Sequence, residues 1–435
     1  MNRILALDGG GIRGVFTLEV LLRIENLLRE HYKSIDPAKA ETFVLRDHFD
    51  FFAGTSTGAI IATCLCWGMP VQRVLDMYVG QGRTMFDPLP WYNPKKYLFE
   101  RFSPIKLTAM LKSLYLEEID EAEKEGACGT SRASDEQGDR KDAAIDEEDA
   151  IVVQDGKQYR LARLGSKLLL NGPGGTGSRK LLLVVVRNAT TGSAWPLTNN
   201  PDAKYNDRKR PDCNLKIPLW KLVRASTAAP TYFPPEEVRF GNTKSIFVDG
   251  SITPYTNPAL IAALTAVLPG YAVGWPTGPE NIRLVSVGTL QFSSELRGKT
   301  PFLKRVLKPR HKGDPEPIEV KNPSLWLGYN ARQIPDALLQ GTTWQQDYLC
   351  RCLGQPMFGE QIDSEVGDLL HDPLLFPNAW FSYVRYNRSY KSRDLHALLR
   401  LDPRLANIDA VEGMPRLREI GRQYAEENVR LWHLI

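Results

Sequence analysis

The chain has 435 residues, of which 43% are hydrophobic, enough to bury the core of one large domain or two modest ones. Its 55 Lys and Arg residues nearly balance 51 Asp and Glu residues, so the net charge of +4 does not indicate a nucleic-acid polymer as partner. No apolar run reaches the roughly 18 residues needed to span a bilayer, and no signal peptide precedes the first predicted strand. We therefore expect a cytoplasmic protein.

Two strand–turn–helix units are predicted at the start of the chain. The run "RILALD" (3–8) predicts a strand, and the apolar stripe that follows, from Thr17 to Leu28, has helical spacing. The run "HFDFFAG" (48–54) predicts a second strand, "TSTG" (55–58) a tight turn, and "AIIATCLCWG" (59–68) a buried helix that ends at Gly68.

An acidic segment interrupts the middle of the chain. Residues 117–150 hold fourteen Asp and Glu residues, four Lys and Arg residues and almost no large apolar groups, which predicts a solvated low-complexity insertion. The passage 167–186, "KLLLNGPGGTGSRKLLLVVV", predicts a hairpin-like turn into a central strand, "KLLLVVVRNAT" (180–190). Further strands are predicted in "SIFVDG" (245–250) and "NIRLVSVGT" (281–289).

Beyond about residue 300 the pattern becomes helical, from Trp326 to Leu353 and from Pro415 to Leu431. Strands that alternate with helices indicate a parallel or mixed sheet covered on both faces. The six cysteines, including the C-x-C pairs Cys64/Cys66 and Cys350/Cys352, form neither a disulfide framework nor a familiar zinc pattern. We expect reduced thiols, no metal and no cofactor.

The pentapeptide "GTSTG" (54–58) fits a nucleophile elbow, in which a serine sits on a sharp turn between a strand and a helix. Backbone crowding in such a turn requires Gly54 and Gly58 on its flanks. The hydroxyl of Ser56 would then lie at a helix N-terminus, where free N–H groups favour developing negative charge. The alternative is a small-residue turn without chemistry.

The glycine-rich stretch "DGGGIRG" (8–14) allows two interpretations. Gly9, Gly11 and Gly14 have the spacing of a dinucleotide-binding loop, but the acid due about 20 residues later falls on Glu30, inside the predicted helix. No Walker lysine is present, because Ser178 occupies that place in "GPGGTGS" (172–178). We favour an oxyanion hole, for which successive glycines supply backbone N–H groups opposite a nucleophile.

A nucleophilic serine needs a base. None of the six histidines ends a strand beside a turn, and His31 and His48 are expected at surface or half-buried positions. Asp249 does end a predicted strand, at the edge where open α/β sheets build their sites. Burial can raise the pKa of such a carboxylate toward the task of accepting the serine proton. The alternative for Asp249 is a residue that merely caps a turn.

Taken in order, "DGGGIRG" (8–14), "GTSTG" (54–58) and "DG" (249–250) resemble the motifs of patatin-like phospholipases, and "RASTAAPTYFPP" (224–235) and "NPA" (257–259) extend the similarity to about residue 290. The resemblance implies that Ser56 is the nucleophile and Asp249 the base of a dyad. It implies an oxyanion hole lined by Gly9, Gly10 and Gly11, with Arg13 bracing the loop. The third family motif usually reads D-G-G or D-G-A, and Ser251 departs from it.

The family fold implies a three-layer α/β/α sandwich, which we expect over residues 1–300, with a mostly helical C-terminal extension, 301–435, packed on it. The implied activity is metal-independent hydrolysis of fatty-acyl esters in phospholipids, of the phospholipase A type. A triacylglycerol lipase, an acyltransferase with the same dyad, and a pseudoenzyme are the alternatives. The segment "FPNAWFSYVRYN" (376–387) is similar to extensions of bacterial members, some of which are membrane-degrading effectors switched on by a nucleotide signal.

Two segments suit peripheral contact with a membrane. Residues 91–102, "WYNPKKYLFERF", interleave aromatic and basic side chains, and residues 297–312, "RGKTPFLKRVLKPRHK", are strongly basic. Core aromatics and a solvated basic loop are the plainer interpretations.

Overall fold

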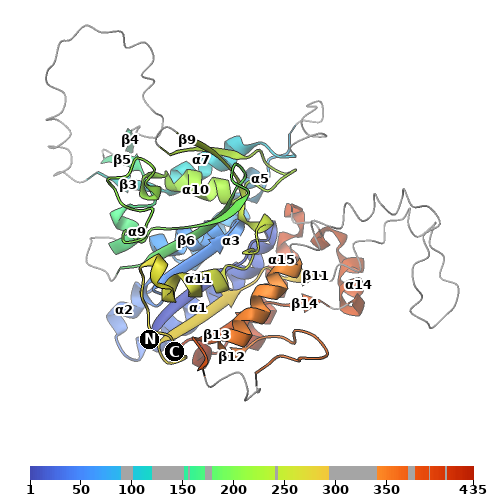
Figure 1. The fold of residues 1–435 in the computed structure, drawn as a ribbon. Coiled ribbons are helices and arrows are strands. Elements are labelled where there is room, and N and C mark those ends of the chain that lie inside the picture. Colours follow the sequence, from blue (N-terminus) through green and yellow to red (C-terminus); the bar gives the residue numbers. More distant parts are fainter. Residues whose placement is uncertain are drawn as a thin grey trace, which may run out of the picture.

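Within the part of the chain that the structure describes, a nine-stranded mixed sheet forms the centre of the protein (Figure 1). The computed structural model describes residues 1–89, 101–119, 151–154, 157–171, 179–240, 243–292, 340–370, 378–390, 392–406 and 409–435. The strands of the sheet are β1 (Asn2–Leu7), β2 (Phe51–Thr55), β6 (Leu181–Asn188), β7 (Ser193–Thr198), β8 (Glu236–Phe240), β9 (Thr243–Asp249), β10 (Ile282–Val287), β12 (Gln355–Phe358) and β13 (Ser382–Tyr386).

The order of strands across the sheet is β12-β13-β10-β1-β2-β6-β9-β8, with β7 also paired to β6. From β12 to β6 all neighbours are parallel, whereas β7 and β9 run antiparallel to β6, and β8 runs antiparallel to β9. The carboxyl ends of β1 and β2 therefore meet at one edge, where the glycine-rich loop and the serine turn begin.

Helices cover both faces of the sheet, because alternate residues of each buried strand point to opposite sides. Leu5 and Leu7 of β1 pack into the core beneath α1 (Gly14–Lys33), α3 (Thr57–Trp67), α10 (Leu219–Ser226) and α15 (Met414–Asn428). Ile4 and Ala6 pack into a second core with α11 (Ala259–Val267) and the helix of residues 340–353. The fold is a three-layer α/β/α sandwich, as the sequence predicts.

The C-terminal region is helical in α14 (Ser392–Leu401) and α15, and it also supplies β12 and β13 to the central sheet beside β10 (Figure 1). These two strands are absent from the sequence-based expectation of a mostly helical extension. All five residues of β13 are buried, so the strand lacks the polar–apolar alternation that marks a strand with one solvated face. The expected boundary at residue 300 falls outside the described residues and stays a prediction.

The prediction of a hairpin-like passage at 167–186 is wrong in its first arm. Lys167–Asn171 forms the short helix α9, and the antiparallel partner of β6 is β7. The helix buries Leu169, and the Arg46 guanidinium donates to the carbonyl oxygens of Leu169 and Leu170, which the last turn leaves without helical partners. Residues 172–178 lie outside the described part of the chain.

The predicted insertion at 117–150 also begins too early, since β3 (Leu116–Glu118) pairs with β5 (Lys157–Leu161) in a small sheet that includes β4 (Ile151–Gln154). Residues 120–150 are outside the described residues, so their solvation stays a prediction. The remaining elements are α2 (Pro37–Glu41), α4 (Val71–Gly80), α5 (Gly82–Met85), α7 (Pro104–Leu114), β11 (Gln291–Phe292) and β14 (Ser389–Tyr390).

Candidate active site

Ser56 occupies a sharp turn between β2 and α3. Its φ of 54° and ψ of −125° lie in a region of backbone conformation where residues other than glycine are strained. The surrounding packing must therefore enforce this conformation. A Cβ on Gly54 would lie 2.3 Å from the Gly58 carbonyl oxygen, and one on Gly58 would lie 2.2 Å from the Leu7 carbonyl oxygen. Both flanking positions therefore admit only glycine, which is the steric reason for the G-x-S-x-G pattern.

The Ser56 hydroxyl points at a buried carboxylate. Ser56 Oγ donates a hydrogen bond of 2.7 Å to Asp249 Oδ2, across 193 residues of sequence. The other carboxylate oxygen, Oδ1, accepts the Ser251 N–H at 2.7 Å, which fixes the orientation of the carboxyl group. Asp249 is 1% exposed and Ser56 is 8% exposed. The two motifs predicted from the sequence thus meet within hydrogen-bond reach.

Burial raises the pKa of Asp249 to about 6, although the Ser251 N–H, the Ser56 hydroxyl and the positive charge of Arg224 all favour the ionised form. Arg224 is fully buried, lies with its guanidinium carbon 5.1 Å from the centre of the Phe233 ring, and donates to the Pro234 carbonyl oxygen. A carboxylate with this pKa is ionised at neutral pH and is a far better proton acceptor than an exposed aspartate.

The glycine-rich loop lies beside Ser56 and is held by bonds from several elements. The Gly9 N–H donates to the Thr256 carbonyl oxygen at 3.0 Å, and the Gly10 N–H donates to Thr57 Oγ1 at 3.2 Å. Gly11 has a φ of 62°, in the left-handed region that favours glycine. Among the residues that the structure describes, no group accepts the Gly11 N–H. The Gly11 N–H is thus open to an incoming oxygen, and the Gly10 N–H becomes open if the Thr57 hydroxyl turns away.

Side chains brace the same loop from two directions. Arg13 Nε donates to the Gly10 carbonyl oxygen at 3.4 Å, and the Tyr78 hydroxyl donates to the Gly11 carbonyl oxygen. A Cβ on Gly9 would lie 2.4 Å from Ser251 Oγ and 3.1 Å from Ser56 Cβ. The unusual Ser251 therefore fills space directly against the loop.

A cavity of about 740 Å³ opens over the serine and the loop, within the range of about 300–1,000 Å³ typical of small-molecule sites. Asp8, Gly9, Gly10, Gly11, Arg13, Ser56, Thr57, Asp249 and Ser251 are among its lining residues. Much of the remaining wall is apolar and comprises Ile60, Met85, Phe86, Leu107, Phe233 and Leu290. The cavity can receive a long apolar group with a reactive bond at its polar end.

Sequence reasoning missed the groups that hold the serine turn in place. The Ser56 N–H donates to Ser226 Oγ at 2.9 Å, and Ser226 in turn donates to the Val185 carbonyl oxygen at 2.7 Å. Ser226 and Arg224 lie in the segment "RASTAAP" (224–230). In the sequence this segment stands out only because it resembles a segment of patatin-like phospholipases. Nothing in its spacing shows that it contacts the serine or the aspartate.

No histidine with a described side chain contacts Ser56. The prediction of a surface or half-buried His48 is wrong, because His48 is 2% exposed and lies between the Tyr32 hydroxyl and the Leu434 carbonyl oxygen. Burial lowers the pKa of His48 to about 3 and that of His433 to about 4. His31 is described as well and contacts Tyr32.

The segments predicted to contact a membrane fall mostly outside the described residues. Residues 91–100 and 297–312 are not described, whereas Phe102 is a core residue, 8% exposed and stacked on Tyr232. None of the helices in the described ranges is long and apolar enough to span a bilayer.

The serine on its strained elbow, the buried carboxylate and the apolar cavity define an enzyme of the acyl-ester hydrolase class. The family model of patatin-like phospholipases matches residues 5–263, and the chain belongs to this family.

Relatives agree with this assignment. The chain is 26% identical, over 312 residues, to a cGAMP-activated phospholipase of Vibrio cholerae, a match that covers 69% of each protein. It is 25% identical, over 302 residues, to the calcium-independent phospholipase A2-gamma of Rattus norvegicus, covering 69% of this chain and 30% of the rat protein. The crystal structure of VipD from Legionella pneumophila aligns with 97% of this chain and 67% of its own, at 13% identity and a TM-score of 0.33, too weak a likeness to add to the assignment.

Proposed function

We propose that this protein is a phospholipase of the A type, which hydrolyses fatty-acyl esters of membrane phospholipids through a dyad of Ser56 and Asp249. The observation that carries the proposal is the hydrogen bond of 2.7 Å from the serine hydroxyl to a carboxylate whose pKa is raised to about 6 by burial. Membership of the family and the phospholipase activities of the relatives support the same chemistry.

The chemistry divides into two displacements. Ser56 Oγ attacks the ester carbonyl carbon while its proton passes to Asp249 Oδ2, which leaves a tetrahedral oxyanion. When the intermediate collapses, the lysophospholipid alkoxide departs with that proton and the acyl group stays on Ser56. Water then attacks the acyl-enzyme in the same way, Asp249 takes and returns a proton, and a fatty acid leaves. No step requires a metal ion.

The glycine-rich loop would stabilise the oxyanion. The Gly11 amide is the first donor we assign, because no described group accepts its N–H. The Gly10 amide is the second, since its N–H is held only by the side-chain hydroxyl of Thr57, whereas the Gly9 N–H is bonded to the Thr256 backbone carbonyl and Gly9 instead provides room beside Ser56. Arg13 holds the Gly10 carbonyl group, which shares its peptide unit with the Gly11 N–H, so this amide keeps its orientation as charge develops; Tyr78 holds the following carbonyl group, that of Gly11. Preorganised donors of this kind contribute about 10²- to 10³-fold each to turnover.

The apolar wall of the cavity suits the acyl chain, and the lipid would be taken from a membrane surface. Ile252 lines the cavity and is 39% exposed, and Arg101, another lining residue, has a side chain 56% exposed. Exposed apolar and basic side chains on the cavity wall are a combination that anionic lipid surfaces attract, and the Arg101 guanidinium also lies 3.8 Å from the Asp409 carboxylate. Peripheral membrane contact is therefore part of the proposal.

The decisive experiment incubates the protein with mixed phospholipid vesicles and identifies released fatty acids and lysolipids by mass spectrometry. We expect both products from the wild type and neither from Ser56→Ala. A fluorophosphonate probe should label the wild type at Ser56 and leave the variant unlabelled. Labelling that survives in Ser56→Ala would refute the assignment of the nucleophile.

A second candidate is a latent effector whose hydrolysis requires a nucleotide. The observation in its favour is the similarity to a cGAMP-activated phospholipase over 69% of this chain. The vesicle assay separates the two candidates when it is run with and without cyclic dinucleotides. Turnover that needs no nucleotide supports constitutive hydrolysis, and turnover that appears only with one supports the switched enzyme.

A further inference from the structure

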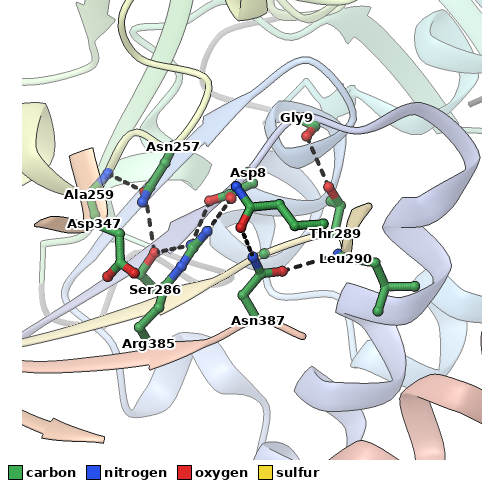
Figure 2. Close-up of polar contacts among 12 residues, drawn as sticks. Asp8, Gly9, Asn257, Ala259, Ser286, Thr289, Leu290, Asp347, Arg385 and Asn387 are labelled. Carbon is green, nitrogen blue, oxygen red and sulfur yellow. Dashed lines mark hydrogen bonds and ion pairs between the residues drawn. The ribbon is translucent and has the colours of Figure 1, made fainter. Parts of the chain in front are cut away.

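A second polar cluster lies against the glycine-rich loop, with Asp8 and Asn387 on the wall of the active-site cavity, and the hydrolytic steps above make no use of it (Figure 2). Its centre is an ion pair between Asp8, the residue before Gly9, and Arg385 on β13. Arg385 Nη1 donates to Asp8 Oδ1 at 2.9 Å and Nη2 donates to Oδ2 at 2.6 Å. Both side chains are 3% exposed, and 377 residues of sequence separate them.

Further hydrogen bonds hold both partners of the ion pair at the carboxyl ends of the strands. Arg385 Nη1 also donates to Ser286 Oγ at 2.7 Å, and Ser286 donates to Asn257 Oδ1, which accepts the Ala259 N–H at the start of α11. The Asp8 N–H donates to the Val287 carbonyl oxygen. Asp8 is thereby held by its backbone to β10 and by its carboxylate to β13.

A second contact runs from the same strand end to the loop. Asn387, two residues beyond Arg385, accepts the Leu290 N–H through Oδ1 at 3.1 Å, and Leu290 has a φ of 73° in the left-handed region (Figure 2). That strained turn presents Thr289, whose Oγ1 donates to the Gly9 carbonyl oxygen at 3.1 Å. Thr289 also closes the space over Gly10, where a Cβ would lie 2.2 Å from its Oγ1.

We propose that Arg385 and Asn387 are positioning residues that set the glycine-rich loop for oxyanion binding, an inference that rests on the proposed function. Three successive glycines have no side chains with which to anchor themselves, so the orientation of their amides must come from neighbours. The bidentate pair fixes the position of Asp8, and Asn387 acts through Thr289 on Gly9. Strand β13 and the residues directly after it thus complete a site whose reacting groups all come from the first 249 residues.

Orientation is the specific contribution of such a pair. A buried ion pair often contributes little net stability compared with an apolar replacement of the same volume, because desolvation of both charges offsets their attraction. Removing one partner alone leaves an unpaired buried charge and destabilises the fold strongly. A test must therefore separate the loss of folded protein from the loss of loop geometry.

The test compares Arg385→Met and Arg385→Lys with Arg283→Met. Arg283 is the matched control, because it is a buried arginine at the opposite end of the same strands, where it bonds Ser382 Oγ and the Trp432 carbonyl oxygen and touches no loop residue. Turnover is expressed per serine that reacts with the fluorophosphonate probe. Two inhibitors are measured as well: a trifluoromethyl ketone lipid analogue, which forms an oxyanion on the serine, and a non-hydrolysable ether phospholipid, which forms none.

We expect Arg385→Met to lower turnover per labelled serine about 10- to 100-fold and to weaken the ketone by the same factor, with the ether lipid unaffected. Arg385→Lys should recover part of both losses. Arg283→Met should lower the melting temperature without changing turnover per labelled serine. If Arg385→Met is insoluble, Asp8→Asn combined with Arg385→Met removes the unpaired charge, and it should restore the melting temperature but not the turnover.

Turnover per labelled serine within twofold of wild type in the Arg385→Met variant, or in the double variant where the single one is insoluble, overturns the inference. Equal weakening of the ketone and the ether lipid overturns it too, since that result describes a general loss of binding. A wild type that neither hydrolyses acyl esters nor reacts at Ser56 refutes the proposed function instead, so the two failures are distinguishable.

Discussion

Asp249→Asn should make the protein more stable and nearly inactive. Burial raises the pKa of Asp249 from its ordinary value of 3.8 to about 6. At neutral pH the folded protein therefore carries an ionised carboxylate whose buried surroundings favour the neutral form. A rise of that size corresponds to about 3 kcal/mol of lost stability above pH 6. The asparagine amide keeps the shape and carries no charge, and it can still accept the Ser251 N–H.

The sign of the effect follows from where each state binds the proton. Below pH 3.8, the pKa of the unfolded chain, the carboxyl group is neutral in both the folded and the unfolded state and does not lower the free energy of unfolding. Between pH 4 and 6 the unfolded chain loses its proton first, so the wild type becomes progressively less stable relative to the variant. Above pH 6 the difference is constant. For a chain of this size we expect a melting temperature about 3 to 6 °C higher for Asp249→Asn at pH 8, and nearly equal values at pH 4.

The assay is differential scanning calorimetry of both proteins between pH 4 and 8, beside vesicle hydrolysis at each pH. Asp212→Asn is a suitable control, because the hydrogen bond from Arg210 lowers the pKa of this exposed carboxylate and its removal should not stabilise the protein at neutral pH. Turnover of Asp249→Asn should fall by several orders of magnitude. A melting-temperature difference that stays flat from pH 4 to 8 would contradict the buried, shifted carboxylate. Near-normal turnover, with one of the six His→Ala variants inactive, would replace the dyad by a Ser–His triad.

Three further outcomes are expected. On the acid side, kcat/KM should reach half its maximum near pH 6 and fall about tenfold by pH 5, because only ionised Asp249 accepts the proton. Arg224→Met should move this midpoint to higher pH, since the positive charge of Arg224 favours the ionised form of Asp249. An unmoved midpoint would show that Arg224 does not influence the pKa of the base. Hydrolysis should persist in excess EDTA, and a loss that one divalent ion restores would indicate a metal-dependent mechanism. Replacing residues 120–148 by a short Gly/Ser linker should leave the melting temperature and soluble yield nearly unchanged, since so few apolar groups contribute little burial; misfolding would mean that the segment is structured.

Sequence patterns predicted the parts of this protein that depend on local chemistry. The G-x-S-x-G turn is recognisable because close contacts allow only glycine at positions 54 and 58. These contacts come from within the turn itself and from the neighbouring strand β1. The early strands and α3 are recognisable because continuous apolar runs predict buried elements. The approach of Asp249 to Ser56 was inferred from strand ends and family resemblance, and the structure brings the two side chains into contact.

Long-range contacts were beyond the reach of such patterns. β13 reads "SYVRY", and an arginine in the middle of a strand normally marks a solvent-facing position, whereas Arg385 is 2% exposed because Asp8 neutralises it. Ser226 and Thr289 likewise have ordinary sequence neighbours and act only through partners far along the chain. The sequence predicts a surface or half-buried His48 because no nearby residue reveals its partner, the carbonyl group of Leu434, which lies 386 residues away.

The order of strands in the sheet has a consequence for synthesis on the ribosome. β1 emerges well before its neighbour β10 and the strand β13 beyond it. At about 5–20 residues per second, roughly 20 to 75 s separate the appearance of Asp8 from that of Arg385, 377 residues later. The edge of β1 has no partner until β10 is made, and β10 has no partner on its far side until β13 follows. Lipolytic competence should therefore arise only after β13 has been made.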